Sequence, residues 1–219
     1  MDREILDIIW LSLRMTFFST AIGAMIGIPV GLWLERANFR GKKLIVTVNR
    51  TLMAAPPVVV GLVVYLLFMR NGFFGVFNLL FTLEVMVIAQ VLLISPIICG
   101  FVYTAASDRA EHIRAFAVTM GASPWQIRKL VFKELRNDLY FSMIAGYGRA
   151  MSEVGAIMIV GGNIRHQTRT MTTAISLMRN RGEFEQAIVL GIVLMGIVFV
   201  IQAAANFLRR KERRHDENY

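Results

Sequence analysis

Residues 107–138 read SDRAEHIRAFAVTMGASPWQIRKLVFKELRND and separate two long apolar runs of the chain. A helix-like sequence stops there at Gly121, and a second one starts at Ser123-Pro124-Trp125. Glycine takes the left-handed conformation that ends many helices, whereas serine followed by proline is typical of a helix start. The stretch therefore predicts a helix–glycine–helix elbow, a feature suited to contact with a soluble partner.

Both arms of this elbow have an amphipathic pattern. Asp108 and Glu111 fit a capping box, which predicts the start of the first helix, and Ser123 predicts the cap of the second. The first helix is expected to carry an apolar face at Ile113, Phe116, Ala117 and Met120. The apolar stripe of the second helix comprises Ile127, Leu130, Val131 and Leu135, opposite the basic residues Arg128, Lys129, Lys133 and Arg136.

Outward from the elbow, the composition indicates a membrane protein. Hydrophobic residues make up 56% of the chain and charged residues 18%, and the mean hydropathy is +0.56. A run of about 20 apolar residues is long enough to cross a bilayer. Five such runs predict an all-α bundle with five transmembrane helices in one domain, residues 1–208: Met15–Leu34, Thr51–Met69, Val85–Ser107, Leu139–Gly162 and Gln186–Leu208.

The basic residues predict the orientation of these five spans. They cluster between the first two spans, in the elbow and in the tail 209–219. With five spans, all three clusters fall on one side, which the positive-inside rule makes cytoplasmic. The amino terminus is then expected outside the cell and the carboxyl terminus in the cytoplasm. Nucleic acid is not an expected partner, because the net charge of +9 is scattered over several loops.

Prolines mark two spans as bent. Pro56-Pro57 opens the second span and Pro96 interrupts the third. Because proline removes a backbone donor, each site is either a tolerated kink or part of a flexing helix beside a water-filled path. Both readings stay open for Pro56-Pro57, which makes the pair a gating candidate, whereas a plain kink is favoured at Pro96. Residues 71–83 are expected to form an interfacial lid on the outer side.

Small residues and charges inside the spans suggest further contacts. Gly23, Gly27 and Gly31 are spaced by four, which permits close helix approach and one possible dimer contact. Arg149 and Glu153 are also four apart and so on one helix face, which predicts either a mutual ion pair or bonds to a neighbouring helix in the fourth span. An alternative role for Arg149 is direct contact with an anion in the pathway.

The external link between the last two spans carries positive charge, although the positive-inside rule places most Lys and Arg residues on the cytoplasmic side. Arg165, Arg169, Arg179 and Arg181 either attract an anion or, as we prefer, dock an acidic partner surface. The hydroxyl groups of Thr170 and Thr172 either line the pathway or cap a helix, and the sequence does not separate these roles.

No catalytic residues, metal site or cofactor are expected in this chain. It lacks the G-x-x-x-x-G-K-[ST] phosphate loop, and no intramembrane His, Asp or Glu pair has acid–base or metal spacing. Cys99 is the single cysteine and is expected to be a packing residue. An enzyme is therefore not predicted.

The segment AFAVTMGASPWQIRKL resembles the EAA-type coupling loop of ABC importer permeases. LMAAPPVVVGLVVYLLF and GYGRAMSEVGAIMIVGGNI are similar to segments of the molybdate, sulfate and especially tungstate permeases. Ala115-Phe116 departs from the Glu-Ala of the motif, and Lys133-Glu134 from a frequent Leu-Pro. The resemblance assigns ATPase coupling to Ala115, Phe116, Ala117, Met120, Gly121, Ala122, Ser123 and Trp125, with Phe116 and Met120 as an apolar knob and Trp125 bracing the elbow.

The resemblance also implies the fold, function, partners and location, which is a bacterial or archaeal cell (inner) membrane. It implies a type I importer permease that acts as a homodimer and transports a tetrahedral oxyanion, with tungstate favoured over molybdate or sulfate. Two ATPase subunits would hold ATP-Mg, and an external binding protein would deliver the substrate. The competing hypothesis is an anion channel or membrane regulator without an ATPase.

Overall fold

The computed structural model describes the backbone of residues 2–216 and the side chains of residues 4–205 and 207. This part of the chain contains helices and no strand, as predicted. The side chains of the predicted tail, residues 209–219, lie outside the described ones. The elements are α1 (Asp2–Arg36), α2 (Lys42–Met53), α3 (Pro57–Phe68), the 3₁₀ turn η1 (Gly75–Phe77), α4 (Leu83–Thr119), α5 (Pro124–Met151), α6 (Gly155–Gly161), α7 (Met171–Asn180) and α8 (Phe184–Asp216).

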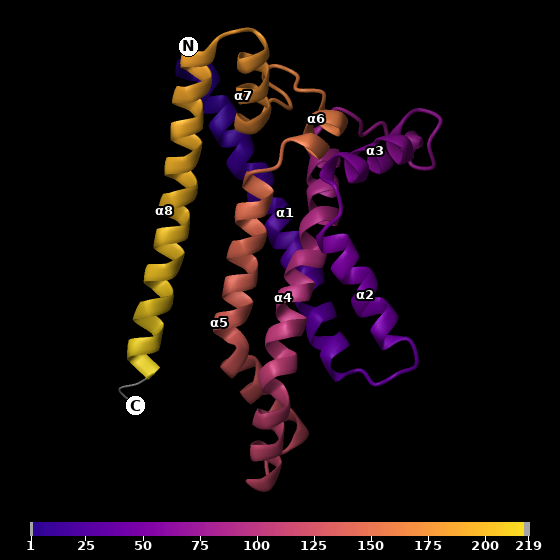
Figure 1. Cartoon of the computed structure of the whole chain (residues 1–219), viewed down its shortest axis with the longest axis vertical. Coiled ribbons are helices and arrows are strands. Elements are labelled where there is room, and N and C mark those ends of the chain that lie inside the picture. Colours follow the sequence, from indigo (N-terminus) through magenta and orange to yellow (C-terminus); the bar gives the residue numbers. More distant parts are fainter. Residues whose placement is uncertain (1, 217–219) are drawn as a thin grey trace.

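Four long helices, α1, α4, α5 and α8, follow the long axis of the molecule, and the two termini lie at opposite ends (Figure 1). Three of them, α1, α4 and α8, are long and apolar enough to cross a membrane. The bent pairs α2–α3 and α5–α6 raise the number to five if each pair counts as one span, which agrees with the five predicted spans.

The second predicted span, Thr51–Met69, is not one helix. It bends by 100° between α2 and α3, at residues 54–56. Pro57 occupies the first turn of α3, and Pro56 immediately precedes it in an extended conformation. Two successive prolines offer no backbone donors and push the residues before them out of the helical region, so α2 ends there. As a result, α3 projects sideways from the bundle (Figure 1).

The fourth predicted span, Leu139–Gly162, is also interrupted. The helices α5 and α6 meet at 59° around residues 152–154. Glu153 lies in this break, where its carboxylate accepts a hydrogen bond from the Ala156 amide at 3.1 Å. The bond satisfies one of the free amides at the start of α6, which helps the short helix begin there.

The first arm of the elbow has no start of its own, so the capping box predicted at Asp108 and Glu111 was wrong. Helix α4 continues without a break from Leu83 to Thr119, and the second arm likewise continues as α5. The sequence around Asp108 contains no proline or glycine, so nothing ends the helix there. Pro96 leaves α4 unbroken as well. The elbow is therefore the joined end of two long helices.

The glycines of α1 allow it to lie close to α4 within the same chain. A Cβ on Gly27 would stand 2.9 Å from the Ser95 carbonyl oxygen and from the Ile98 side chain, and Gly23 and Gly31 meet Ile94 and Val102 in the same way. The close approach predicted from the spacing is thus confirmed, but it is not available for a dimer contact.

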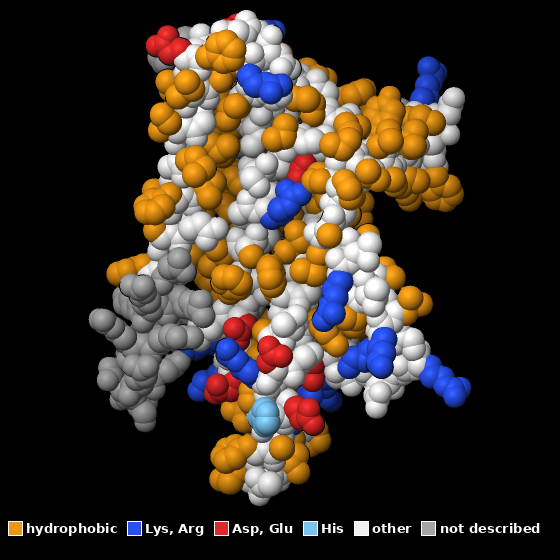
Figure 2. Space-filling model, in the orientation of Figure 1, with side chains coloured by type: hydrophobic (Ala, Val, Ile, Leu, Met, Phe, Trp, Pro, Cys, Tyr) orange, Lys and Arg blue, Asp and Glu red, His pale blue; other side chains and the backbone are white. Residues whose placement is uncertain are grey.

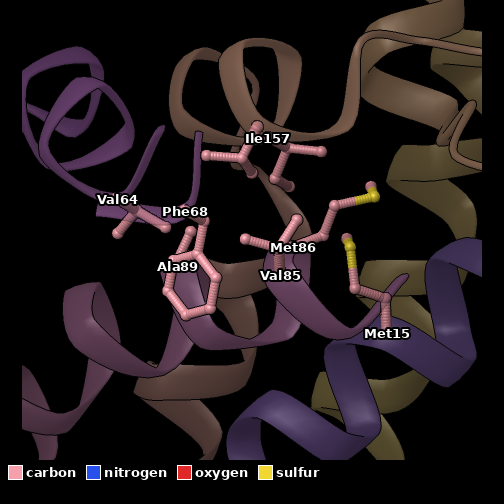
Figure 3. Packing of buried hydrophobic residues seen from close by; sticks show 8 residues of the cluster. Met15, Val64, Phe68, Val85, Met86, Ala89 and Ile157 are labelled. Carbon is pink, nitrogen blue, oxygen red and sulfur yellow. The ribbon is translucent and has the colours of Figure 1, made fainter. Parts of the chain in front are cut away.

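One cluster of buried apolar side chains lies between α1, α3, α4 and α6, toward the end of the molecule opposite the elbow. Figure 3 shows Met15 of α1 beside Met86 of α4, with Phe68 and Val64 of α3 and Ile157 of α6 completing the cluster. In contrast, α8 buries little of its surface against the rest of the chain. Its exposed apolar side chains face outward, as expected of a helix surrounded by lipid or a second subunit.

Candidate functional site

The elbow is shaped by backbone hydrogen bonds around Gly121. The Ala122 amide donates to the Ala117 carbonyl and the Gly121 amide to the Val118 carbonyl, each at 3.0 Å. This pair of bonds is a Schellman motif, which requires a left-handed residue, and Gly121 supplies it with φ +71°. The motif satisfies carbonyl groups that the end of α4 would otherwise leave unpaired.

The second arm begins as the sequence predicts. Ser123 caps α5, with Pro124 in its first turn. The Ser123 side chain accepts from the Gln126 amide at 3.4 Å, and the Gln126 side chain accepts from the Ser123 amide at 2.7 Å. This reciprocal capping box fixes where the chain re-enters a helix after Gly121.

The tip of the elbow exposes apolar side chains. Phe116, Met120 and Trp125 are 64%, 72% and 70% exposed, and support of the elbow by Trp125 stays a prediction. Ala115 is exposed beside them, whereas Ala117 faces inward and is buried. Figure 2 shows orange side chains at this end of the molecule, beyond a zone of charged ones. Exposed large apolar groups at a helix turn favour insertion into a partner's pocket.

The inner face of the elbow holds its two arms together. Ala110 of α4 packs with Val131 and Leu135 of α5, and Ile113 and Ile127 flank them. An ion pair between Arg109 and Asp138, 3.0 Å apart, also joins the arms. A second ion pair, between Arg114 and Glu35, joins the elbow to the end of α1.

The predicted ion pair in the fourth span is present. Arg149 Nη1 lies 2.6 Å from Glu153 Oε2, with Glu153 3% exposed and Arg149 about one third exposed along its side chain. The two residues are not on one helix, because Glu153 lies in the break. The pairing neutralises two charges that would be costly in the membrane interior if they stood alone.

Sequence reasoning missed two polar residues that support this site. Gln90 of α4 is fully buried and donates to the Ala150 carbonyl at 2.7 Å, while Ser19 of α1 donates to the Gln90 side chain at 2.6 Å. The three helices are thus linked beside Arg149. The sequence did contain a signal for Gln90, because it is the single polar residue within the apolar run MVIAQVLLI.

Thr170 and Thr172 lie at the start of α7 and both are buried. Thr170 caps α7 in a capping box with Thr173, which is one of the two roles considered for it. Thr172 does not cap α7, and its hydroxyl donates to the Glu153 carbonyl at 2.8 Å. Thr172 also connects α7 to the break beside Arg149.

The four arginines of the last link do not form one group. Arg165 and Arg169 both pair with Glu4 at the start of α1, and Glu4 raises the pKa of Arg165 above its ordinary value. Arg179 and Arg181 are exposed. A carboxylate neutralises much of the charge on the first two residues, so Arg179 and Arg181 remain the stronger docking candidates.

The described residues form an all-helical bundle with broken spans and an exposed apolar elbow at one end. The chain belongs to the family of binding-protein-dependent transport system inner membrane components, whose model matches residues 27–214. It is therefore an inner-membrane permease subunit of an ABC importer.

Individual relatives agree with this assignment. The tungstate uptake system permease TupB of Peptoclostridium acidaminophilum is 40% identical over 96% of this chain and 92% of its own length. A probable anion ABC transporter permease of Haloferax volcanii is 38% identical over 88% of this chain and 85% of its own. The sulfate permease CysW of Escherichia coli is 25% identical over 97% of this chain and 77% of its own.

A solved structure shares the fold. The inward-facing methionine ABC transporter MetNI contains a chain that superimposes with a TM-score of 0.76. The match covers 95% of both chains at 20% identity, so it concerns the fold and not the substrate. The relatives are permeases, which are non-catalytic membrane subunits.

Proposed function

We propose that two copies of this chain form the pathway of an importer for a tetrahedral oxyanion, with tungstate first and molybdate or sulfate next. The similarity of this chain to tungstate and sulfate permeases supports this substrate class. Two copies of an ATPase subunit would bind the elbows and hold ATP-Mg, and an external binding protein would deliver the anion.

The observation that carries the proposal is the apolar tip of the elbow. Phe116 and Met120 extend from the joined ends of α4 and α5, which are continuous with two spans. A partner that grips this tip would move both helices without an intervening joint. Closure of the ATPase pair would then shift the bundle between two packings, one open to each side.

The proposal includes the orientation predicted from charge, with the elbow in the cytoplasm. The start of α1 and the link before α8 would then face the binding protein, with Arg179 and Arg181 available to it. The 100° bend at Pro56-Pro57 and the Arg149–Glu153 pair at the α5–α6 break are our candidates for the moving part of the pathway.

The decisive experiment is co-purification of the chain with its ATPase, followed by ATP-driven tungstate uptake in proteoliposomes. The double variant Phe116→Ala/Met120→Ala should lose most ATPase binding and uptake. Phe73→Ala is the matched control, because Phe73 is also exposed (83%) but lies near the far end of α3. Conduction of anions by the chain alone in lipid, without ATP, would instead support the channel hypothesis.

A further inference from the structure

The end of α1 is fastened to the first arm of the elbow by a two-pronged ion pair. Arg114 Nη1 donates to Glu35 Oε1 at 2.7 Å, and Nη2 donates to Oε2 at 2.5 Å. Glu35 is the penultimate residue of α1, and Arg114 lies on the part of α4 that forms the elbow. Arginine and a carboxylate in this arrangement form one of the stronger and more directional polar contacts in proteins.

Burial strengthens this contact relative to a surface ion pair. The Glu35 side chain is 9% exposed and that of Arg114 is 28% exposed. Leu32 and Ile28 of α1 pack beside it, against the apolar cluster of the elbow. Partly buried charges are screened less by salt than exposed ones, so the pair holds α1 against the elbow under cellular conditions.

The contact continues from α1 into α2. Lys42, the first residue of α2, donates to the Glu35 carbonyl at 2.9 Å, and its ammonium group also lies over the Tyr103 ring of α4. Helix α2 leads directly to the 100° bend at Pro56-Pro57. A chain of contacts therefore runs from Arg114 through Glu35 and Lys42 to the most strongly bent span.

We infer that the Glu35–Arg114 pair is a strut that transmits movement of the elbow to α1 and α2. The inference rests on the proposed function, because it assumes that an ATPase moves the elbow. Both residues act by position and touch no substrate. Without the strut, the end of α1 and the start of α2 would follow the elbow less closely, while the glycine contact would still hold the middle of α1 on α4. ATP would then be hydrolysed with less transport.

Spatial contiguity alone does not establish energetic coupling, so the test must measure the coupling itself. The complex of this chain with its ATPase and binding protein is reconstituted in proteoliposomes, and tungstate uptake is measured per ATP hydrolysed. Glu35→Gln and Arg114→Gln should each lower this ratio by about fivefold or more, within the range of known coupling effects. Hydrolysis itself should persist, which a loss of folding would not allow.

Two further variants sharpen the test. The exchange Glu35→Arg/Arg114→Glu restores a pair of opposite polarity and should recover most of the ratio. Arg109→Gln is the matched control, because Arg109 forms an ion pair on the same elbow with Asp138, which does not involve α1. Its ratio should equal that of the unaltered protein.

Three results would contradict the role of the Glu35–Arg114 pair as a strut. The first is an unchanged ratio of uptake to hydrolysis in Glu35→Gln, and the second is a failure of the exchanged pair to restore this ratio. The third is an equally large fall of the ratio in Arg109→Gln. Loss of ATPase binding in Glu35→Gln would also count against it, since a strut acts after docking. If the unaltered chain does not bind an ATPase, that result contradicts the proposed function, and the inference of a strut is contradicted as well because it depends on that function.

Discussion

Gly121 sets the shape of the elbow through its backbone conformation. A Cβ at this position meets no atom within 4 Å, so a substitution acts through the positive φ and not through a clash. The left-handed conformation costs a residue with a Cβ about 1–2 kcal/mol. We expect Gly121→Ala to loosen the elbow tip and to weaken ATPase binding by about tenfold, measured by titration of the reconstituted complex.

A matched control exists for Gly121→Ala. Gly182, between α7 and α8, also has positive φ (+78°) and open space around it. Gly182→Ala should cause a similar loss of thermal stability while leaving ATPase binding intact. Equal weakening of binding in both variants would show that backbone strain, and not elbow geometry, determines the result.

Gln90 is the buried residue whose replacement should be most informative about the α5–α6 break. Gln90→Leu keeps the approximate volume but removes the Gln90 bonds to the Ala150 carbonyl and to the Ser19 hydroxyl, and the Ala150 carbonyl keeps the Glu153 amide as its donor. The loss of a typical hydrogen bond costs about 0.5–1.5 kcal/mol. We expect a lower unfolding temperature in detergent, whereas Gln186→Leu, on the exposed start of α8, should change it little. Equal effects would contradict a role for the buried network.

At the scale of elements, the sequence patterns predicted that a helix exists more reliably than they predicted the residues at which it begins and ends. Three of the five predicted spans are single helices long enough to cross a membrane, and the start at Ser123-Pro124 was predicted correctly, because length, hydropathy and capping chemistry are local properties. The capping box at Asp108 was wrong, since the same residues are compatible with the interior of a solvated helix. The break at Glu153 was missed although the contacts of its side chain with Arg149 and with the Ala156 amide are local, because the spacing of four was read as one continuous helix. Only the bond from the Thr172 hydroxyl to the Glu153 carbonyl joins this break to a distant segment.

The candidate site also contains features that the sequence predicted and contacts that it did not predict. The knob at Phe116 and Met120 was expected from the resemblance to the coupling loop, and both side chains are exposed. The amphipathic pattern alone had grouped them with Ile113 and Ala117, which face inward. The Glu35–Arg114 contact was not predicted, because its two residues are 79 positions apart and nothing local links them. This contact forms because α1 packs on α4, and that packing can be seen only in the folded structure.

The packing of α1 on α4 gives a prediction about Gly27. Gly27→Ala places a methyl group 2.9 Å from the Ser95 carbonyl oxygen, so the two helices must separate. Overpacking of this kind costs about 1–3 kcal/mol, and a lower unfolding temperature in detergent is expected. Gly196→Ala in α8 meets no neighbouring atom within 4 Å, and because alanine favours a helix it should be neutral or stabilising. Equal destabilisation of both variants would refute the close contact.

For the whole molecule, the proposed orientation can be tested with the help of its single cysteine. Cys99 is buried and can be replaced by alanine to give an unreactive background. Phe116→Cys and Phe73→Cys then place one thiol at each end of the molecule. In intact cells, a membrane-impermeant maleimide should label position 73 and not position 116. Labelling of position 116 from outside would place the elbow beyond the reach of any cytoplasmic ATPase.

The unbroken course of α4 has a mechanical consequence. Its 37 residues make a rod roughly 55 Å long at about 1.5 Å per residue. The apolar core of a bilayer is about 30 Å thick, so roughly 25 Å of the rod stands clear of it. Such a rod behaves as a lever with its fulcrum near the membrane surface. A pull of a few ångströms at the elbow would therefore swing the far end of α4, where it packs against α3 and α6, by a comparable distance in the opposite direction.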